Sequence, residues 1–111
     1  MKMTTKLALI AASLAFGISA LQAADATELY TKNCAPCHGK DGKGQTTMGK
    51  RVGAKDYTDP KTWEGWDDAK AFKSVKEGMK EGDKEKMKPF AEKLSDDEIK
   101  SAIGHLKTFK P

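Results

Sequence analysis

The sequence predicts a small all-α domain whose core needs a bound group to complete it. Helical spacing of apolar residues, every three or four positions, appears in residues 25–34, 67–78 and 95–110, whereas strand-like alternation is weak. Hydrophobic residues make up 38% of the chain, and many of them belong to its first 21 residues. A domain this small buries only about 60% of its extended-chain surface and commonly needs a disulfide, a metal or a cofactor.

Residues 1–24 are predicted to be a secretory signal peptide. They combine a basic start, "MKMTTK", with an apolar run over residues 7–21 and the small-residue exit "QAA". The alternative is a retained membrane anchor, but the run has 15 residues and a spanning helix needs about 20. We therefore expect cleavage after Ala23 or Ala24, export to the periplasm, and a single mature domain over residues 25–111.

The charge pattern argues against nucleic-acid binding. The formal net charge of the whole chain is +4, and two of its lysines lie in the predicted leader, so the mature domain is only weakly basic. Arg51 is the single arginine, and no basic patch is interleaved with aromatic residues. No later stretch is apolar enough to span a bilayer, so we expect no stable membrane insertion of the mature form. We also expect the mature protein to be a monomer.

The first half of the mature chain predicts one helix followed by loops. Ala26, Leu29 and Tyr30 share a helical face. Glycines at positions 39, 42 and 44 then interrupt the chain. Residues 45–62 lack sustained periodicity, which predicts a loop with at most one short helical turn.

The second half predicts two helices separated by a charged loop. Asp67 or Asp68 begins the first of them, and Gly78 suits a left-handed cap at its end. The segment "MKEGDKEKMKPF" has mixed charge and an internal glycine, so we expect a solvated loop. Ser95 and Glu98 then form the pattern of a capping box that begins the last helix.

Both cysteines of the chain and one of its two histidines lie in "NCAPCHGKDG", residues 33–42. A redox-active Cys-x-x-Cys pair needs a preceding strand in a βαβ unit, and the flanks here indicate helix. A structural zinc site needs four ligands, but His105 stands alone as the remaining candidate. Cys-x-x-Cys-His is also the haem-attachment motif, in which Cys34 and Cys37 form thioethers and His38 is an axial iron ligand. Only this interpretation uses every residue of the motif.

The mature chain resembles the class I c-type cytochromes of the small, single-haem bacterial kind. The resemblance covers essentially all of residues 25–111. It is carried by "ELYTKNCAPCHGKDGKG" near the start and by "KMKPFAEKLSDDEIKSAIGHLKTF" near the end. It implies the all-α cytochrome c fold, with crossing N- and C-terminal helices and short helices and loops around one covalent haem c.

Met87 is our candidate for the second axial ligand. It lies in an aperiodic stretch shortly before Pro89, and the family resemblance indicates the same residue. We interpret Met48 and Met79 as flexible core fillers. His105 is the rival ligand, but the resemblance favours it as a substitute for an aromatic residue where the terminal helices cross.

Three further residues have open roles. Trp63 and Trp66 either place a ring against the haem or an indole N–H near a propionate, or they are ordinary packing residues. Arg51 either pairs with a propionate or lies on the surface.

The sequence departs from many relatives in the loop that follows the motif. There, a proline carbonyl commonly accepts a hydrogen bond from the axial imidazole, but this chain has no proline between Pro36 and Pro60. We therefore expect another backbone carbonyl, near Gly49 to Val52, to orient His38.

These features predict a periplasmic electron shuttle and not an enzyme. Positive charge near the haem-binding segments would steer it to redox partners with acidic docking surfaces. The lysines concerned are Lys32, Lys40, Lys43, Lys84, Lys86 and Lys88. The alternatives are a gas sensor or small peroxidase with a labile sixth ligand, and a dedicated cytochrome subunit of a dehydrogenase or oxidase.

Overall fold

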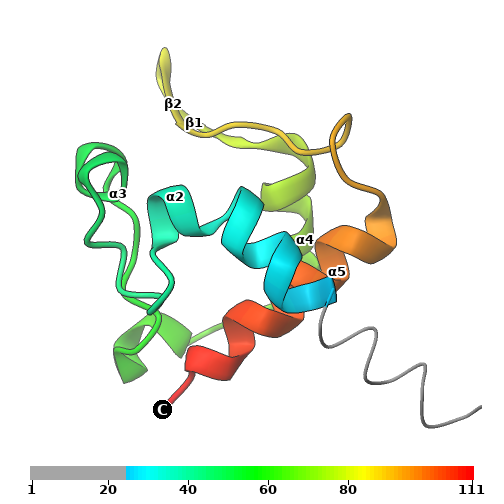
Figure 1. The fold of residues 1–111 in the computed structure, drawn as a ribbon. Helices are drawn as coiled ribbons and strands as arrows, with labels where there is room; N and C mark the ends of the chain where they lie inside the picture. The colour runs from blue at the N-terminus through cyan, green and yellow to red at the C-terminus, as the bar shows by residue number, and fades with distance from the viewer. Residues whose placement is uncertain (1–24) are drawn as a thin grey trace, which may run out of the picture.

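Helices dominate the computed structural model, which describes residues 25–111 (Figure 1). The predicted signal peptide lies outside the described residues. A helix over residues 25–33, called here the N-terminal helix, comes first. It is followed by α2 (Ala35–His38), α3 (Thr47–Val52), a 3-10 helix (Pro60–Trp63), α4 (Asp68–Glu77), β1 (Met79–Glu81), β2 (Lys84–Met87), α5 (Asp96–Leu106) and a final 3-10 turn (Lys107–Phe109). None of the described helices is long and apolar enough to cross a membrane.

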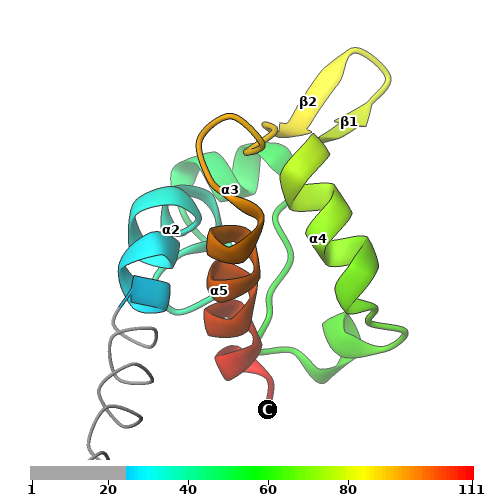
Figure 2. The same cartoon turned by 90° about the vertical axis from the view of Figure 1, so that its right-hand side faces the viewer.

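The N-terminal helix lies against α5 (Figures 1 and 2). Tyr30 is the central contact, with its ring centroid 4.8 Å from that of His105 and 5.5 Å from that of Phe109. The Tyr30 hydroxyl, which is buried, donates a 2.8 Å hydrogen bond to the Gly39 carbonyl. His105 therefore lies among the aromatic residues between the terminal helices, as predicted, and Tyr30 also holds the loop that follows the cysteine motif.

A small apolar cluster forms the core between α4 and α5. Ile99 and Ile103 of α5 are buried there with Phe90 and Leu94 from the preceding segment. Phe72, on α4, packs against the same cluster. No polar or charged residue is buried in the described part of the chain.

The helix boundaries follow the predicted caps. The Ser95 hydroxyl accepts from the Glu98 amide at 3.2 Å, and the Glu98 carboxylate accepts from the Ser95 amide at 3.0 Å, which completes the capping box. Asp67 caps α4 through its side chain. Gly78 has the expected positive φ of 80°, but its ψ of 177° is not left-handed helical, because the chain continues directly into the extended strand β1.

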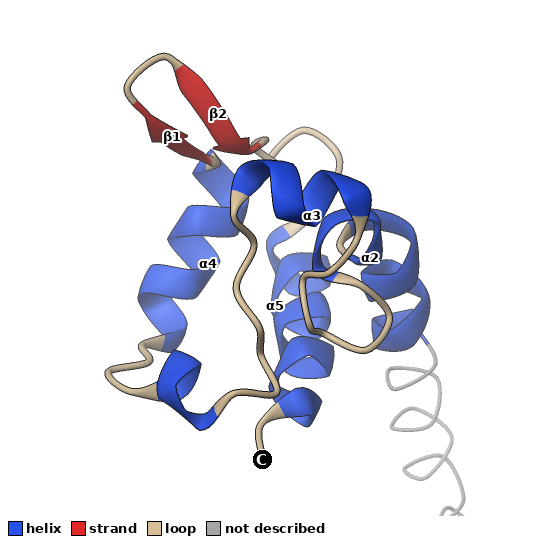
Figure 3. Ribbon diagram, turned by 90° about the vertical axis from the view of Figure 1, so that its left-hand side faces the viewer, coloured by secondary structure: helices blue, strands red, loops and turns tan. Residues whose placement is uncertain are grey.

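The charged segment after α4 is a β-hairpin, so the prediction of a loop there was wrong. Lys80 pairs with Glu85 and Glu81 with Lys84 across the two strands. Gly82, at φ 60°, begins the two-residue turn as a type II′ turn requires. The hairpin projects from the domain (Figure 3). Its strands are mostly exposed and polar, so they lack the apolar alternation that marks a strand in a sequence.

Residues 45–62 also contain more helix than predicted. Thr46 caps α3, which has six residues, and Asp59 caps the 3-10 helix that ends at Trp63. Side-chain caps and tertiary contacts, which leave no apolar periodicity, define both elements.

Candidate functional site

The two cysteines and the first histidine lie together on α2. Cys34 is the N-cap residue of this short helix, and its carbonyl accepts from the amides of Cys37 at 3.2 Å and His38 at 2.9 Å. Pro36 lies in the first turn, where a proline costs no hydrogen bond. Both cysteines are free thiols, and both are partly buried. One helical turn thus presents two thiols and an imidazole within a few residues.

Burial favours the neutral forms of these groups. It raises the pKa of the Cys34 thiol to about 11, and the neighbouring Cys37 adds to this shift because two thiolates would repel each other. Burial also lowers the pKa of the His38 imidazole, since a charged ring would lose its hydration there. A neutral imidazole keeps a nitrogen lone pair available for a metal.

The Nδ1 atom of His38 is buried and has no hydrogen-bond partner among the described residues. The predicted carbonyl contact from residues 49–52 is therefore absent here. The Gly49 carbonyl instead accepts from the Gly53 and Ala54 amides at the end of α3. Tyr57 lies beside the imidazole, with ring centroids 5.5 Å apart. This is a contact between tilted rings and supplies no hydrogen bond to Nδ1.

Helix α3 packs directly on α2 through Thr46, which sequence reasoning missed, and through Gly49, which it had considered only as a carbonyl for His38. The Thr46 hydroxyl donates to the Cys37 carbonyl at 2.9 Å and accepts from the Gly49 amide at 2.9 Å. A Cβ added to Gly49 would collide with the Cys37 carbonyl oxygen and would lie 2.7 Å from the Gly44 carbonyl oxygen. An isolated glycine three residues after a capping threonine was the available signal, since a glycine inside a helix costs stability and so points to a packing reason.

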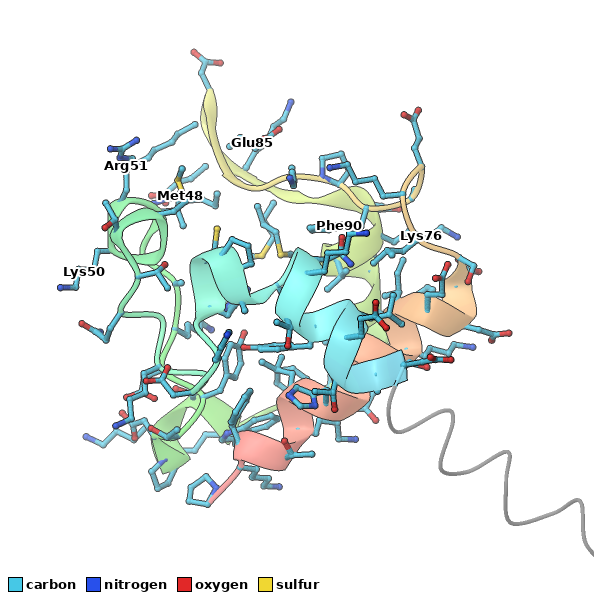
Figure 4. All side chains as sticks on the ribbon, in the orientation of Figure 1. Met48, Lys50, Arg51, Lys76, Glu85 and Phe90 are labelled. Atoms are coloured by element: carbon cyan, nitrogen blue, oxygen red, sulfur yellow. The ribbon has the colours of Figure 1, made fainter. Side chains whose placement is uncertain are left out.

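Met87 is less exposed than the other two methionines of the described chain. It is partly buried at the end of β2 and packs against the core cluster. Met48 and Met79 are 45% and 49% exposed, so their interpretation as core fillers was wrong (Figure 4 shows Met48 on α3). Met87 lies on a different element from the cysteine motif, and the packing of β2 on α3 and of α3 on α2 connects the two.

The two tryptophans form an aromatic cluster with Tyr57. Trp63 is buried and donates its indole N–H to the Tyr57 carbonyl at 2.7 Å. The ring centroids of Trp66 and Trp63 are 4.6 Å apart, and the Trp66 indole N–H donates to the Asp68 carboxylate at 2.6 Å. Both indole N–H groups are thus bonded within the protein, which favours packing over a hydrogen bond to a propionate.

The charged residues near the hairpin are partly engaged with one another. Lys84 donates to the Arg51 carbonyl at 3.2 Å, and Lys86 forms a 3.3 Å ion pair with Glu81. The Arg51 side chain itself is exposed on α3 (Figure 4). Lys32 lies elsewhere, in an acid-lined groove beside α5. The six predicted docking lysines therefore do not form one uniform free surface.

Comparison with known proteins identifies the family. Residues 21–106 match the family described as "Cytochrome C oxidase, cbb3-type, subunit III". The chain is 35% identical over 98 residues to cytochrome c-553 of Nitratidesulfovibrio vulgaris (strain DSM 19637 / Miyazaki F), a match that covers 87% of this chain and 88% of that protein. The chain belongs to the c-type cytochromes. The fold of this cytochrome agrees, because the solved structure of the KustC0563 c-type cytochrome matches it with a TM-score of 0.67 and 32% identity.

That structural match covers 78% of this cytochrome and 99% of KustC0563, and a solved mutant of KustC0563 matches to the same extent at 31% identity. The predicted all-α cytochrome c fold of the small class I kind is thereby confirmed. Membership of the family makes the chain a haem-based electron-transfer protein, and family members carry haem c.

The contact between Gly49 and α2 predicts a large effect of one methyl group. Gly49→Ala should lower the free energy of unfolding by about 2 kcal/mol, because the added carbon meets backbone atoms that cannot rotate away. Gly104→Ala is the control, since its added carbon meets nothing within 4 Å on α5, and it should stabilise by about 0.5–1 kcal/mol. Chemical denaturation measures both, and equal stability of the two variants would contradict the close approach.

Proposed function

We propose that this cytochrome carries single electrons through one haem c, attached by Cys34 and Cys37 and ligated by His38 and Met87. The observation that carries the proposal is α2, where two free thiols share one turn with an imidazole whose Nδ1 atom is buried and unpartnered. These residues fit the group, since the attachment motif needs two thiols this close and an axial ligand directly behind them. When bound, the haem supplies an iron that gains or loses one electron.

The chain around α2 keeps this arrangement rigid. Tyr30 bonds the Gly39 carbonyl directly after the motif, and Thr46 bonds the Cys37 carbonyl inside it. Both contacts fix backbone atoms, so the imidazole of His38 would keep its position in both oxidation states. Small structural change on electron transfer is what a shuttle needs.

Met87 would close the remaining axial position. Its thioether favours the reduced iron compared with a second imidazole, which raises the reduction potential. A firmly closed position leaves no site for a gas or a peroxide, so the sensor and peroxidase alternatives require that Met87 is a labile ligand or does not ligate. The packing of the partly buried Met87 against an apolar cluster supports a fixed position.

Export and docking complete the proposal. Residues 1–24 have the composition of a signal peptide, so we place the mature shuttle in the periplasm, with residues 25–111 as one domain. Lys40, Lys43 and Lys88 are exposed in the described structure. They would steer the protein to redox partners with acidic docking surfaces, and such steering weakens as salt is added.

A second candidate is a cytochrome that stays bound to a larger oxidase. The observation in its favour is the matching family, whose description names a subunit of a cbb3-type oxidase. It uses the same haem and the same ligands, and differs only in whether the domain dissociates from its partner.

The ligand assignment predicts a contrast between two paired methionines. Met87→Ala should abolish the sulfur-to-iron absorption band, lower the reduction potential and let carbon monoxide bind the reduced protein. Met79 pairs with Met87 across the hairpin and is exposed, so Met79→Ala should leave the band and the carbon monoxide exclusion unchanged. A band that survives Met87→Ala would show that another residue ligates the iron.

Dissociation from a partner is tested on the exported protein in its native host. A shuttle should be released with the soluble periplasmic contents and should elute alone at the size of one mature domain. Constant stoichiometric co-purification with an oxidase through several columns would contradict the shuttle and establish the bound subunit.

A further inference from the structure

The segment that follows Met87 is bonded to the end of α4. The Phe90 amide donates to the Val75 carbonyl at 3.0 Å, and the Ala91 amide donates to the Lys76 carbonyl at 3.2 Å. The last carbonyls of a helix have no partner within the helix, so these bonds satisfy groups that would otherwise need water. Figure 4 shows Phe90 and Lys76 on the same side of the domain. The chain just beyond Met87 therefore has a fixed place at one end of a helix.

Gly78, the C-cap residue of α4, lies against this segment. A Cβ added to Gly78 would lie 2.7 Å from the Met87 carbonyl oxygen, 2.8 Å from the Pro89 nitrogen and 3.1 Å from the Lys88 carbonyl carbon. All three are backbone atoms, so no side-chain rotation relieves the overlap. The approach of residues 87–89 to the end of α4 thus requires a residue without a side chain.

Pairing within the hairpin also constrains the backbone of Met87. Met79, which follows Gly78 directly, pairs with Met87, and a register shift occurs between Met79 and Lys80. Lys80 pairs with Glu85, so one residue of β2 is extra at this point. Such bulges re-aim a side chain relative to the regular alternation of a strand. Consistent with this, the residues at positions 86 and 87 are both partly buried, although they are consecutive.

We propose that Gly78 is a positioning residue for Met87. Its missing side chain lets the backbone of residues 87–89 lie against the end of α4, and this contact, together with the bulged pairing to Met79, directs the Met87 thioether. The inference rests on the proposed ligation of the iron by Met87. It assigns to the end of α4, a region remote in sequence from the attachment motif, control over the sixth ligand.

The test compares two glycines that share a positive φ. Gly78 has φ 80° and Gly65 has φ 68°, so alanine is strained at either position, but a Cβ on Gly65 meets nothing within 4 Å. In haem-loaded protein at neutral pH, Gly78→Ala should lose the sulfur-to-iron band and should bind carbon monoxide when reduced. Gly65→Ala should keep the band and exclude carbon monoxide. Helical circular dichroism and covalent haem content should stay at the wild-type level in both.

The possible outcomes distinguish failure of this inference from failure of the proposed ligation by Met87. Absence of the band in the wild-type protein would refute ligation by Met87. The band could instead be present in both the wild type and Gly78→Ala. If denaturant then abolished it at the same concentration in Gly78→Ala as in Gly65→Ala, only the role of Gly78 would be overturned.

A measurement on the wild-type protein applies if Gly78→Ala does not fold. In increasing denaturant, hydrogen-exchange protection of the Phe90 and Ala91 amides should be lost together with the band. A band that persists after these two amides have exchanged would equally overturn the inference, because the contact with α4 would then be unnecessary for ligation.

Discussion

Burial of the His38 Nδ1 atom without a partner is costly, since an unsatisfied buried polar atom costs about 1–3 kcal/mol. The cluster of buried apolar residues in the described chain, which has four members, does not include His38 or any other residue of α2. Burial also lowers the pKa of the imidazole, so the ring stays neutral and its other nitrogen keeps a lone pair that a metal would bind. The two thiols on the same helical turn would attach the haem that carries this metal.

Close backbone contacts at two glycines organise the rest of the domain. Gly49 lets α3 lie on the Cys37 carbonyl, and Gly78 lets the end of α4 lie on the backbone that carries Met87. Each contact fixes the main chain next to a residue that would hold the proposed haem. Because the contacts involve backbone atoms, they hold the main chain at these two places with little dependence on side-chain rotamers. Under the proposed ligation, the same principle governs the placement of His38 and of Met87, although the two glycines belong to different elements of the fold.

The sequence predicted the elements that depend on local features, namely helix caps, helical spacing and the cysteine motif. The cap at Ser95 and the helical spacing around it located α5, and Asp67 located α4 in the same way. The Cys-x-x-Cys-His pattern was evident because its residue types and spacing match the haem-attachment motif, and the c-type cytochrome family is confirmed. His105 was also placed correctly, beside Tyr30, although this expectation came from the family resemblance.

The remaining features depend on tertiary contacts that leave no local pattern. The hairpin strands are polar and exposed, so they resemble a solvated loop in sequence. The Gly49 carbonyl was unavailable to His38 because α3 uses it at its own end, which required knowing that α3 exists. Met48 and Met79 are apolar and yet exposed, and only the position of their elements at the surface accounts for this.

Covalent attachment of the haem is the claim that most directly decides the function. It is measured by extracting the exported protein with acidified acetone and recording the pyridine haemochrome spectrum of the protein fraction. One haem per chain should remain with the polypeptide through two thioether bonds, one to Cys34 and one to Cys37. Release of the pigment into the acetone, or colourless protein from a host able to mature such cofactors, would contradict it.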